Sequence, residues 1–248
     1  MSTVLQAAEG GVVTLTMNRP EVRNALDAAT YRGLSAALAA AGKDAAVRAV
    51  VVTGAGGHFT AGNDLHDFQN LALDGEPAGL TYLKAISTFE KPLLAAVEGV
   101  AVGIGTTMLL HCDFAWAGEG ARLRMPFVPL GLCAEGGSSL LLPRLAGQKR
   151  ASDLLLTGRE FGAAEALEAG LLTGTTAAGG ALARAQEVAR QVAALPPEAV
   201  RVTKALLRRP IQERLQETLM VEIAEFAARL GSDEAQAAFA AFFAKRNR

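Results

Sequence analysis

The sequence is poor in the residues that mark several common classes of protein. Only two cysteines occur, Cys112 and Cys133, and they do not form a metal-ligand spacing. Twenty-four basic residues against twenty-five acidic ones leave a net charge of -1, so no basic surface for nucleic acid is indicated. The apolar run "PLLAAV" is far shorter than a membrane span. We therefore expect a protein that binds no metal, no nucleic acid and no membrane.

The sequence also lacks the features of a secretory signal. Its start, "MSTVLQAAEGG", has neither a basic region nor an apolar stretch. Two thiols without such a signal fit a reducing compartment, so we expect a cytoplasmic location. The 248 residues, half of them hydrophobic, suffice for a sizeable core in one large domain or in one domain with an appendage.

Two glycine-rich segments come close to nucleotide-binding motifs without completing them. In "GAGGHF" the third glycine position of G-x-G-x-x-G is Phe59, and in "GIGTTM" it is Met108. The P-loop pattern G-x-x-x-x-G-K-[ST] does not occur. A nucleotide-dependent oxidoreductase or an NTPase is therefore not predicted.

Short strands and helices alternate along the first three quarters of the chain. Residues 4–17 are typical of two strands around a glycine turn, and Asp27 is placed to cap the helix that follows. Buried strands are predicted within 47–57 and 93–105, and a hairpin within 113–125. More than one strand for each helix indicates an α/β fold.

The last quarter of the sequence has a different pattern. After about residue 180 the segments are amphipathic and helical, separated by Pro196-Pro197, Pro210 and Gly231. We predict a core over residues 1–195 and a helical module over 196–248, whose apolar positions contact both the core and another subunit.

Two of the glycine-containing segments also suit a different chemistry. "FTAGNDL" (59–65) and "GVAVGIG" (99–105) both place small residues at the ends of predicted buried strands. Glycine lets a ligand oxygen approach a backbone N–H, and two such junctions can aim two N–H groups at one carbonyl oxygen. The alternative is that both are tight turns.

The segment "FVPLGLCAEGGSSLLLP" (127–143) contains a single charged residue, Glu135. An unpaired carboxylate in an apolar setting is costly, so its presence needs an explanation. It is either a functional acid or base, or a loop residue that faces solvent or caps the helix at "GGSSLLL".

Together these segments resemble the crotonase, or enoyl-CoA hydratase/isomerase, superfamily over nearly the whole chain. The segments that carry the resemblance are "LTMNRPEVRNAL" (15–26), "FTAGNDL" (59–65), "EGVAVGIGTTMLLHCD" (98–113), "MPFVPLGLCAEGGSSLLLPRLAG" (125–147) and "ASDLLLTGREFGAAEALEAGLL" (151–172). The resemblance implies a crotonase-like spiral of repeated β-β-α units with a C-terminal helical oligomerisation module. It also implies trimers or pairs of trimers, and an acyl-CoA thioester substrate.

The same resemblance assigns roles to individual residues. The backbone N–H groups of Asn63 and Ile104 fall where the family holds the thioester oxygen. Ile104 replaces a glycine common at that place, so its side chain must point away from the oxygen. The implied CoA and thioester path is lined by Ala61, Gly62, Asn63, Asp64 and Leu65, with Arg23 and Ala25 near the adenosine end. The alternative for Arg23 is a solvated surface charge.

The family's hydratases use two glutamates to hold a water, and both are missing here. Their places are taken by Thr107 and Phe127. Glu135 instead stands where similar peroxisomal-type Δ3,Δ2-enoyl-CoA isomerases carry a single catalytic glutamate. A lone carboxylate in a dry pocket suits proton transfer along an acyl chain, because desolvation makes it a stronger base. Asp64 is the rival base, but we prefer it as a helix cap.

We therefore predict an isomerase that shifts the double bond of an unsaturated fatty acyl-CoA, with Glu135 as acid and base. It would need no cofactor, since coenzyme A is part of the substrate. The alternatives are another crotonase-family activity, such as enoyl-CoA hydratase, and a catalytically weak acyl-CoA-binding scaffold. Acyl chain length, cis or trans preference and pathway are not predicted.

Overall fold

A computed structural model describes residues 2–64 and 77–246. Its larger sheet has six strands in the order β1-β2-β3-β4-β6-β9. β1 is antiparallel to β2, and all the other pairs in this sheet are parallel. The strands are β1 (Val4–Glu9), β2 (Val12–Met17), β3 (Ala49–Gly54), β4 (Leu93–Val97), β6 (Phe114–Gly118) and β9 (Gly174–Thr176).

A smaller sheet of three strands lies beside the first, in the order β5-β7-β8. Its strands are β5 (Val100–Val102), β7 (Arg122–Arg124) and β8 (Glu160–Gly162). β5 directly follows β4 in the chain, and β7 directly follows β6. In this part of the chain each turn adds one strand to each sheet, as in the predicted spiral of β-β-α units.

The structure differs from the sequence prediction in two details. Within 93–105 the predicted strand is found as β4, but a second strand that was not predicted, β5, follows Glu98 and Gly99 and lies in the other sheet. The segment 113–125 is not a hairpin, because β6 pairs with β4 and β9 while β7 pairs with β5 and β8. In both segments the glycines carry the chain from one sheet to the other.

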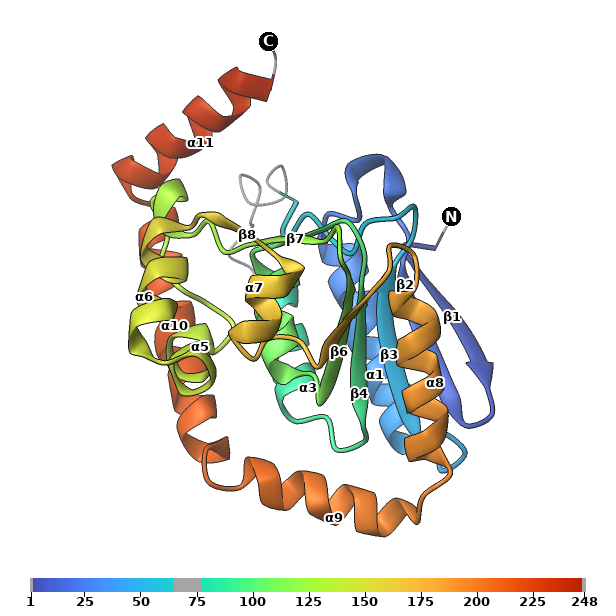
Figure 1. Cartoon of the computed structure of the whole chain (residues 1–248). Coiled ribbons are helices and arrows are strands. Elements are labelled where there is room, and N and C mark those ends of the chain that lie inside the picture. The colour runs from blue at the N-terminus through green and yellow to red at the C-terminus, as the bar shows by residue number, and fades with distance from the viewer. Residues whose placement is uncertain (1, 65–76, 247–248) are drawn as a thin grey trace.

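Helices cover both faces of the larger sheet (Figure 1). Helix α8 (Ala181–Ala193) buries its alanines on the face that carries Val51, Leu94 and Trp116. Helices α1 (Ala28–Lys43) and α3 (Ala78–Ser87) lie side by side on the opposite face, over the main core. Asp27 caps α1 as predicted, by accepting a hydrogen bond from the N–H of Thr30 at 2.7 Å.

Shorter helices connect the strands and precede the helical tail. Those between the strands are η1 (Pro20–Val22), α4 (Ile104–Thr107), η2 (Met108–His111), η3 (Val128–Leu130), α5 (Ser138–Ala146), α6 (Gln148–Thr157) and α7 (Ala163–Glu168). The predicted helix start at Ser138 is confirmed.

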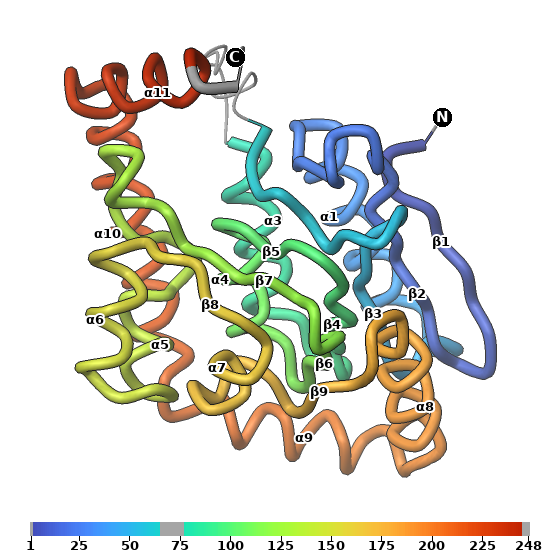
Figure 2. Tube along the Cα trace, turned by 45° about the horizontal axis from the view of Figure 1, so that its top comes forward, coloured from blue at the N-terminus to red at the C-terminus, as the bar shows by residue number. Residues whose placement is uncertain are grey.

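The tail consists of α9 (Pro197–Arg208), α10 (Gln212–Leu230) and α11 (Asp233–Arg246). Helix α9 crosses one end of the core, and α10 then runs back beside α5 (Figures 1 and 2). Lys204 and Arg208 fasten α9 to the core by ion pairs with Asp113, at 2.6 and 3.1 Å. The boundary between residues 195 and 196 falls between α8 and α9, but as a domain boundary it stays a prediction.

Within the described ranges, 2–64 and 77–246, no helix is long and apolar enough to cross a membrane.

Candidate active site

The two predicted oxyanion segments lie side by side. Thr60 pairs with Ala101 in a parallel bridge: its N–H donates to Val100, and its carbonyl accepts from Val102. Gly62 follows at a φ of +86°, where a Cβ would lie 2.5 Å from the Val102 carbonyl oxygen. Only glycine fits this close approach, so Gly62 of "FTAGNDL" is needed to bring the two junctions together.

The backbone of Asn63 is oriented by its pairing with Leu26. Leu26 donates its N–H to the carbonyl of Gly62 at 2.8 Å and accepts from the N–H of Asp64 at 3.0 Å. In a parallel bridge the flanking residues make these bonds, so the N–H of Asn63 points away from Leu26. Among the residues that the structure describes, this N–H donates to no protein group.

Ile104 presents its N–H for a related reason. It is the first residue of α4, and Gly103 before it has a φ of +56° that turns the chain into the helix. The first N–H groups of a helix have no partner within it. The Ile104 N–H donates to no group in the described part of the chain. The Ile104 side chain is buried, with an exposed fraction of 1%.

Asn63, Ile104 and Glu135 line one cavity of about 190 Å³. The cavity is walled mainly by apolar side chains of α1, α3 and α10. The other lining residues are Leu26, Ala28, Tyr31, Asp64, Pro77, Ala78, Gly79, Leu80, Leu83, Ile223, Phe226, Ala227 and Leu230. An apolar pocket with a few convergent polar groups is the usual form of a small-molecule site.

Glu135 is buried, with an exposed fraction of 7%. Its Oε1 accepts a hydrogen bond from the Thr107 hydroxyl at 2.7 Å. Neither of the alternatives predicted for a loop glutamate is found, because the side chain does not face solvent and does not cap α5. Burial raises the pKa of Glu135 to about 8, the Thr107 hydrogen bond opposes this rise, and the charge of Glu222 adds to it.

The loop that carries Glu135 is held by other buried side chains. His111 donates its Nε2–H to the carbonyl of Gly136 at 2.7 Å. Glu222 of α10 accepts from the backbone N–H groups of Gly137 and Ser139, at 2.6 and 2.9 Å. Burial lowers the pKa of His111 to about 4, so it is a neutral donor at neutral pH. The Glu135 loop is therefore fixed by contacts from both η2 and α10.

Sequence reasoning missed the role of Thr107 and the contribution of Glu222. Thr107 was noted only as the replacement of a family carboxylate. Its place three residues after Ile104, on the same short helix, could have suggested a neighbour of the site. Glu222 falls on the apolar stripe of α10, in line with Leu215 and Leu219, and a charge at such a position is a usable signal.

Tyr31 is a further cavity residue that the sequence did not single out. Its hydroxyl donates a hydrogen bond to Asn63 Oδ1, and its ring packs 5.7 Å from that of Tyr82. Burial raises the pKa of Tyr31, and the charge of Glu135 raises it further, so the group is a neutral donor. Tyr31 thus ties α1 to the side chain of a predicted oxyanion residue.

Asp64 lines the same cavity but has a cationic partner. It forms an ion pair with Arg19 at 3.0 Å, and Arg19 also contacts Asp27 at 3.4 Å. This pairing makes Asp64 a poorer candidate for the base than Glu135, whose carboxylate forms no ion pair among the described residues. The helix that Asp64 was predicted to cap lies outside the described residues, as does Leu65.

The remaining predicted residues lie beside the cavity and do not line it. Arg23 accepts a backbone hydrogen bond from Ala61 at 2.9 Å, and its own side chain is exposed. Ala25 accepts a hydrogen bond from Arg19 Nη1 at 2.6 Å. Gly62 is buried against Val102. The contacts of these residues with CoA stay a prediction.

Phe127 stands where the resemblance places a hydratase glutamate. It is buried, and its ring lies edge-on to Phe226 of α10 at a centroid distance of 6.5 Å. A Cβ on Gly103 would lie 3.8 Å from the Phe127 ring. The aromatic side chain therefore lies close to the turn that presents the Ile104 N–H.

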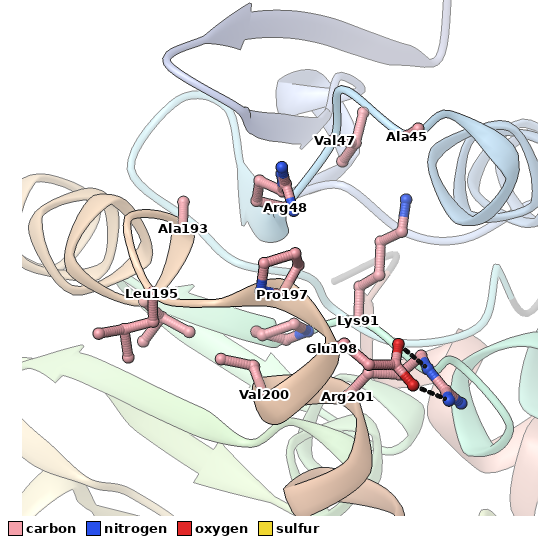
Figure 3. Close-up of a pocket in the computed structure, with 12 residues that line it drawn as sticks. Ala45, Val47, Arg48, Lys91, Ala193, Leu195, Pro197, Glu198, Val200 and Arg201 are labelled. Atoms are coloured by element: carbon pink, nitrogen blue, oxygen red, sulfur yellow. Dashed lines mark hydrogen bonds and ion pairs between the residues drawn. The ribbon is translucent and has the colours of Figure 1, made fainter.

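A second cavity, of about 230 Å³, lies where α8 passes into α9 (Figure 3). Its acid and its lysine are already paired, because Glu198 binds Arg201 and Lys91 donates to two backbone carbonyls. It lacks an unpaired acid or base among the described residues, so we regard it as a structural junction. No cluster of potential metal ligands occurs in the described ranges.

Known proteins resemble the chain over almost its whole length. A family model described as "Enoyl-CoA hydratase/isomerase" matches residues 7–248. The chain is 36% identical over 246 residues to "Probable enoyl-CoA hydratase" of Rhizobium meliloti (strain 1021), covering 98% of this chain and 96% of that one. It is 32% identical over 250 residues to "Enoyl-CoA delta isomerase 2" of Rattus norvegicus, covering 98% and 64%.

Solved structures confirm the predicted fold. A crystal structure of an enoyl-CoA hydratase/isomerase from Pseudoalteromonas atlantica T6c has a TM-score of 0.94 and 43% sequence identity. The match covers 98% of this chain and 97% of that one.

Proposed function

Because this chain belongs to the enoyl-CoA hydratase/isomerase family, we propose that it is a Δ3,Δ2-enoyl-CoA isomerase with Glu135 as its acid and base. The burial of Glu135 in the cavity beside Asn63 and Ile104 carries the proposal. Thr107 and Phe127, at the places of the two hydratase glutamates, support it further.

The proposed reaction moves one proton along the acyl chain. In a 3-enoyl thioester, the Glu135 carboxylate removes a proton from C2, and the electron pair of the C–H bond delocalises into the thioester and the C3–C4 double bond. The protonated Glu135 then returns the proton to C4, and the double bond lies between C2 and C3. Atoms and charge balance without a redox step, so no cofactor is proposed.

The dienolate between the two transfers carries its negative charge on the thioester oxygen. The N–H groups of Asn63 and Ile104 are suited to hold this oxygen, because neither donates to a described protein group. Preorganised donors of this kind typically contribute about 3–4 kcal/mol each to transition-state stabilisation. The Tyr31 hydroxyl supports the arrangement by holding the Asn63 side chain.

The environment of Glu135 gives the reaction a defined pH dependence. Its pKa of about 8 means that the carboxyl is mostly protonated at pH 7 in the empty site. Only the ionised form removes the C2 proton, so kcat/KM should rise with pH and level off above about 8. The raised pKa makes the ionised form a stronger base than an ordinary glutamate.

Hydration of 2-enoyl-CoA is the second candidate, since the Rhizobium meliloti relative is named a probable hydratase. It would require Glu135 and the Thr107 hydroxyl to hold the water between them. Phe127 opposes this, because it places an apolar ring near the oxyanion turn. A catalytically weak acyl-CoA-binding scaffold is the remaining alternative.

One assay separates these functions. The purified protein and Glu135→Gln are each given 3-enoyl-CoA and 2-enoyl-CoA, and products are followed by chromatography. The isomerase predicts conversion of the first substrate, little hydration of the second, and a loss of turnover of about 1,000-fold or more in the variant. Equal turnover by both proteins would refute the role of Glu135. Tight binding without turnover would identify a scaffold.

We also propose that the chain assembles as a trimer or a pair of trimers in the cytoplasm. Apolar side chains remain exposed on α9 and α10, among them Leu206, Leu207, Met220 and Val221. We expect these exposed apolar side chains to be covered by another subunit, since a large exposed apolar patch typically marks an association site. Sedimentation equilibrium measures the assembly, and a monomer at micromolar concentration would contradict it.

A further inference from the structure

Helix α10 carries a buried carboxylate on a face that is otherwise apolar. Glu222 has an exposed fraction of 6%, and it follows Leu215 and Leu219, which are also buried. Ile223 and Phe226, next on the same side of the helix, line the candidate active-site cavity. A buried charge at this position is costly unless it is paired or performs a task.

The hydrogen bonds of Glu222 hold the loop that follows Glu135. Its two carboxylate oxygens accept from the N–H groups of Gly137 and Ser139 at 2.6 and 2.9 Å. These N–H groups lie at the start of α5, where the helix dipole also favours a negative charge. The carboxylate of Glu222 therefore lies against two N–H donors and the positive end of a helix dipole.

Glu222 lies against the same short turn as Glu135, the proposed acid and base. The N–H of Ser138 donates to the Glu135 carbonyl at 3.2 Å, so the turn from Glu135 leads directly into the two groups that Glu222 binds. A second negative charge on Glu135 is therefore disfavoured by Glu222 as well as by burial. In the described part of the chain, no Lys or Arg forms an ion pair with either carboxylate.

Several other titratable groups near Glu135 and Glu222 are neutral or already paired. Tyr31 and His111 are neutral at pH 7, because burial raises the pKa of the first and lowers that of the second. Asp64 is paired with Arg19. Cys133 contacts the backbone of Glu222 from the Glu135 loop, while Glu225 and Arg229 follow Glu222 on α10 itself, where Arg229 forms an ion pair with Glu234.

We propose that Glu222 is a positioning residue for the proton transfer, which clamps the Glu135 loop through the N–H groups of Gly137 and Ser139 and sets the electrostatic environment of the Glu135 carboxyl. The inference rests on the proposed function, because it assigns Glu222 a role in tuning that acid and base. It makes α10 part of the catalytic machinery as well as a wall of the cavity.

The test is a titration of the Glu135 carboxyl by difference infrared spectroscopy. A protonated carboxylic acid gives a C=O stretching band. The band that disappears in Glu135→Gln is assigned to Glu135. In Glu222→Gln the side chain keeps its size and one acceptor oxygen but loses its charge. The midpoint of the Glu135 signal should then fall by about one pH unit, and the kcat/KM profile should move with it.

Two further variants separate charge from packing. Glu217→Gln removes a charge from an exposed position of α10 and should leave the midpoint unchanged. Glu222→Asp keeps the charge on a shorter side chain, so the midpoint should stay near that of the wild type. If Glu222→Gln does not fold, Glu222→Asp still tests the proposal. A Glu135 midpoint well below that of the wild type in Glu222→Asp, which keeps the charge, would overturn it.

The outcome is distinguishable from that of the proposed function. An unchanged midpoint in a folded Glu222→Gln protein would refute the role of Glu222, even if isomerase turnover depends on Glu135. A lowered midpoint in a protein without isomerase activity would support the role of Glu222 and refute the proposed function alone.

Discussion

Replacing Glu135 with glutamine should change how the stability of the protein depends on pH. The pKa of Glu135 is raised from 4.5 to about 8 in the folded protein, chiefly by burial. An unfolded chain releases this proton near pH 4.5, while the folded chain keeps it until about pH 8. Between these values the folded state binds more protons, so the free energy of unfolding falls as pH rises.

The size of the effect follows from the shift. The difference of 8 - 4.5 = 3.5 units corresponds to about 5 kcal/mol, at 1.36 kcal/mol for each unit. Such a loss is comparable with the whole free energy of unfolding of many domains, about 5–15 kcal/mol. The uncharged amide of the variant removes this contribution, so its stability should depend less on pH.

Urea unfolding from about pH 4 to about pH 9 measures the effect. Protein concentration is held fixed, because any subunit assembly adds to apparent stability. The contributions of the other titrating groups cancel in the difference in free energy of unfolding between wild type and Glu135→Gln. As pH rises over this range, the wild type should lose about 5 kcal/mol relative to the variant. The exposed Glu217→Gln serves as the matched control. A difference in free energy of unfolding that does not change with pH would refute the conclusion that burial raises the pKa of Glu135 and makes it a strong base.

Three other substitutions test the surroundings of the site. Thr107→Val removes the hydrogen-bond donor that stabilises ionised Glu135, so the pH profile of kcat/KM should move to higher pH. At pH 7 kcat/KM should be about 10-fold lower. Thr107→Ser keeps the hydroxyl and should retain the wild-type profile. Tyr31→Phe frees the Asn63 side chain and should lower kcat/KM by about 3- to 10-fold; unchanged kinetics would separate Tyr31 from the oxyanion site. Gly62→Ala places a Cβ 2.5 Å from a backbone oxygen at a φ of +86°, so the melting temperature should fall, and wild-type melting would show that the close approach is not rigid.

The sequence by itself determined the local elements and the type of chemistry. The glycine turn within 4–17 indicated β1 and β2, and the apolar run within 47–57 indicated β3. Asp27 marked the start of α1, and glycines marked the two oxyanion junctions. A single charge in the apolar segment 127–143 identified Glu135 as a residue that needs an explanation. These signals are local, because they depend on backbone preferences and on neighbours within a few residues.

Only the tertiary structure decided which strands pair and what surrounds Glu135. The segment 113–125 has the pattern of a hairpin, yet its strands join different sheets, where β6 pairs with β4 and β9 while β7 pairs with β5 and β8. Thr107 reaches Glu135 across 28 positions, and Glu222 reaches Gly137 across 85. Burial, and with it the raised pKa of Glu135, arises from side chains that distant segments bring to one cavity. Sequence spacing alone does not show which distant side chains will surround Glu135, because their positions are set by packing of the whole folded chain.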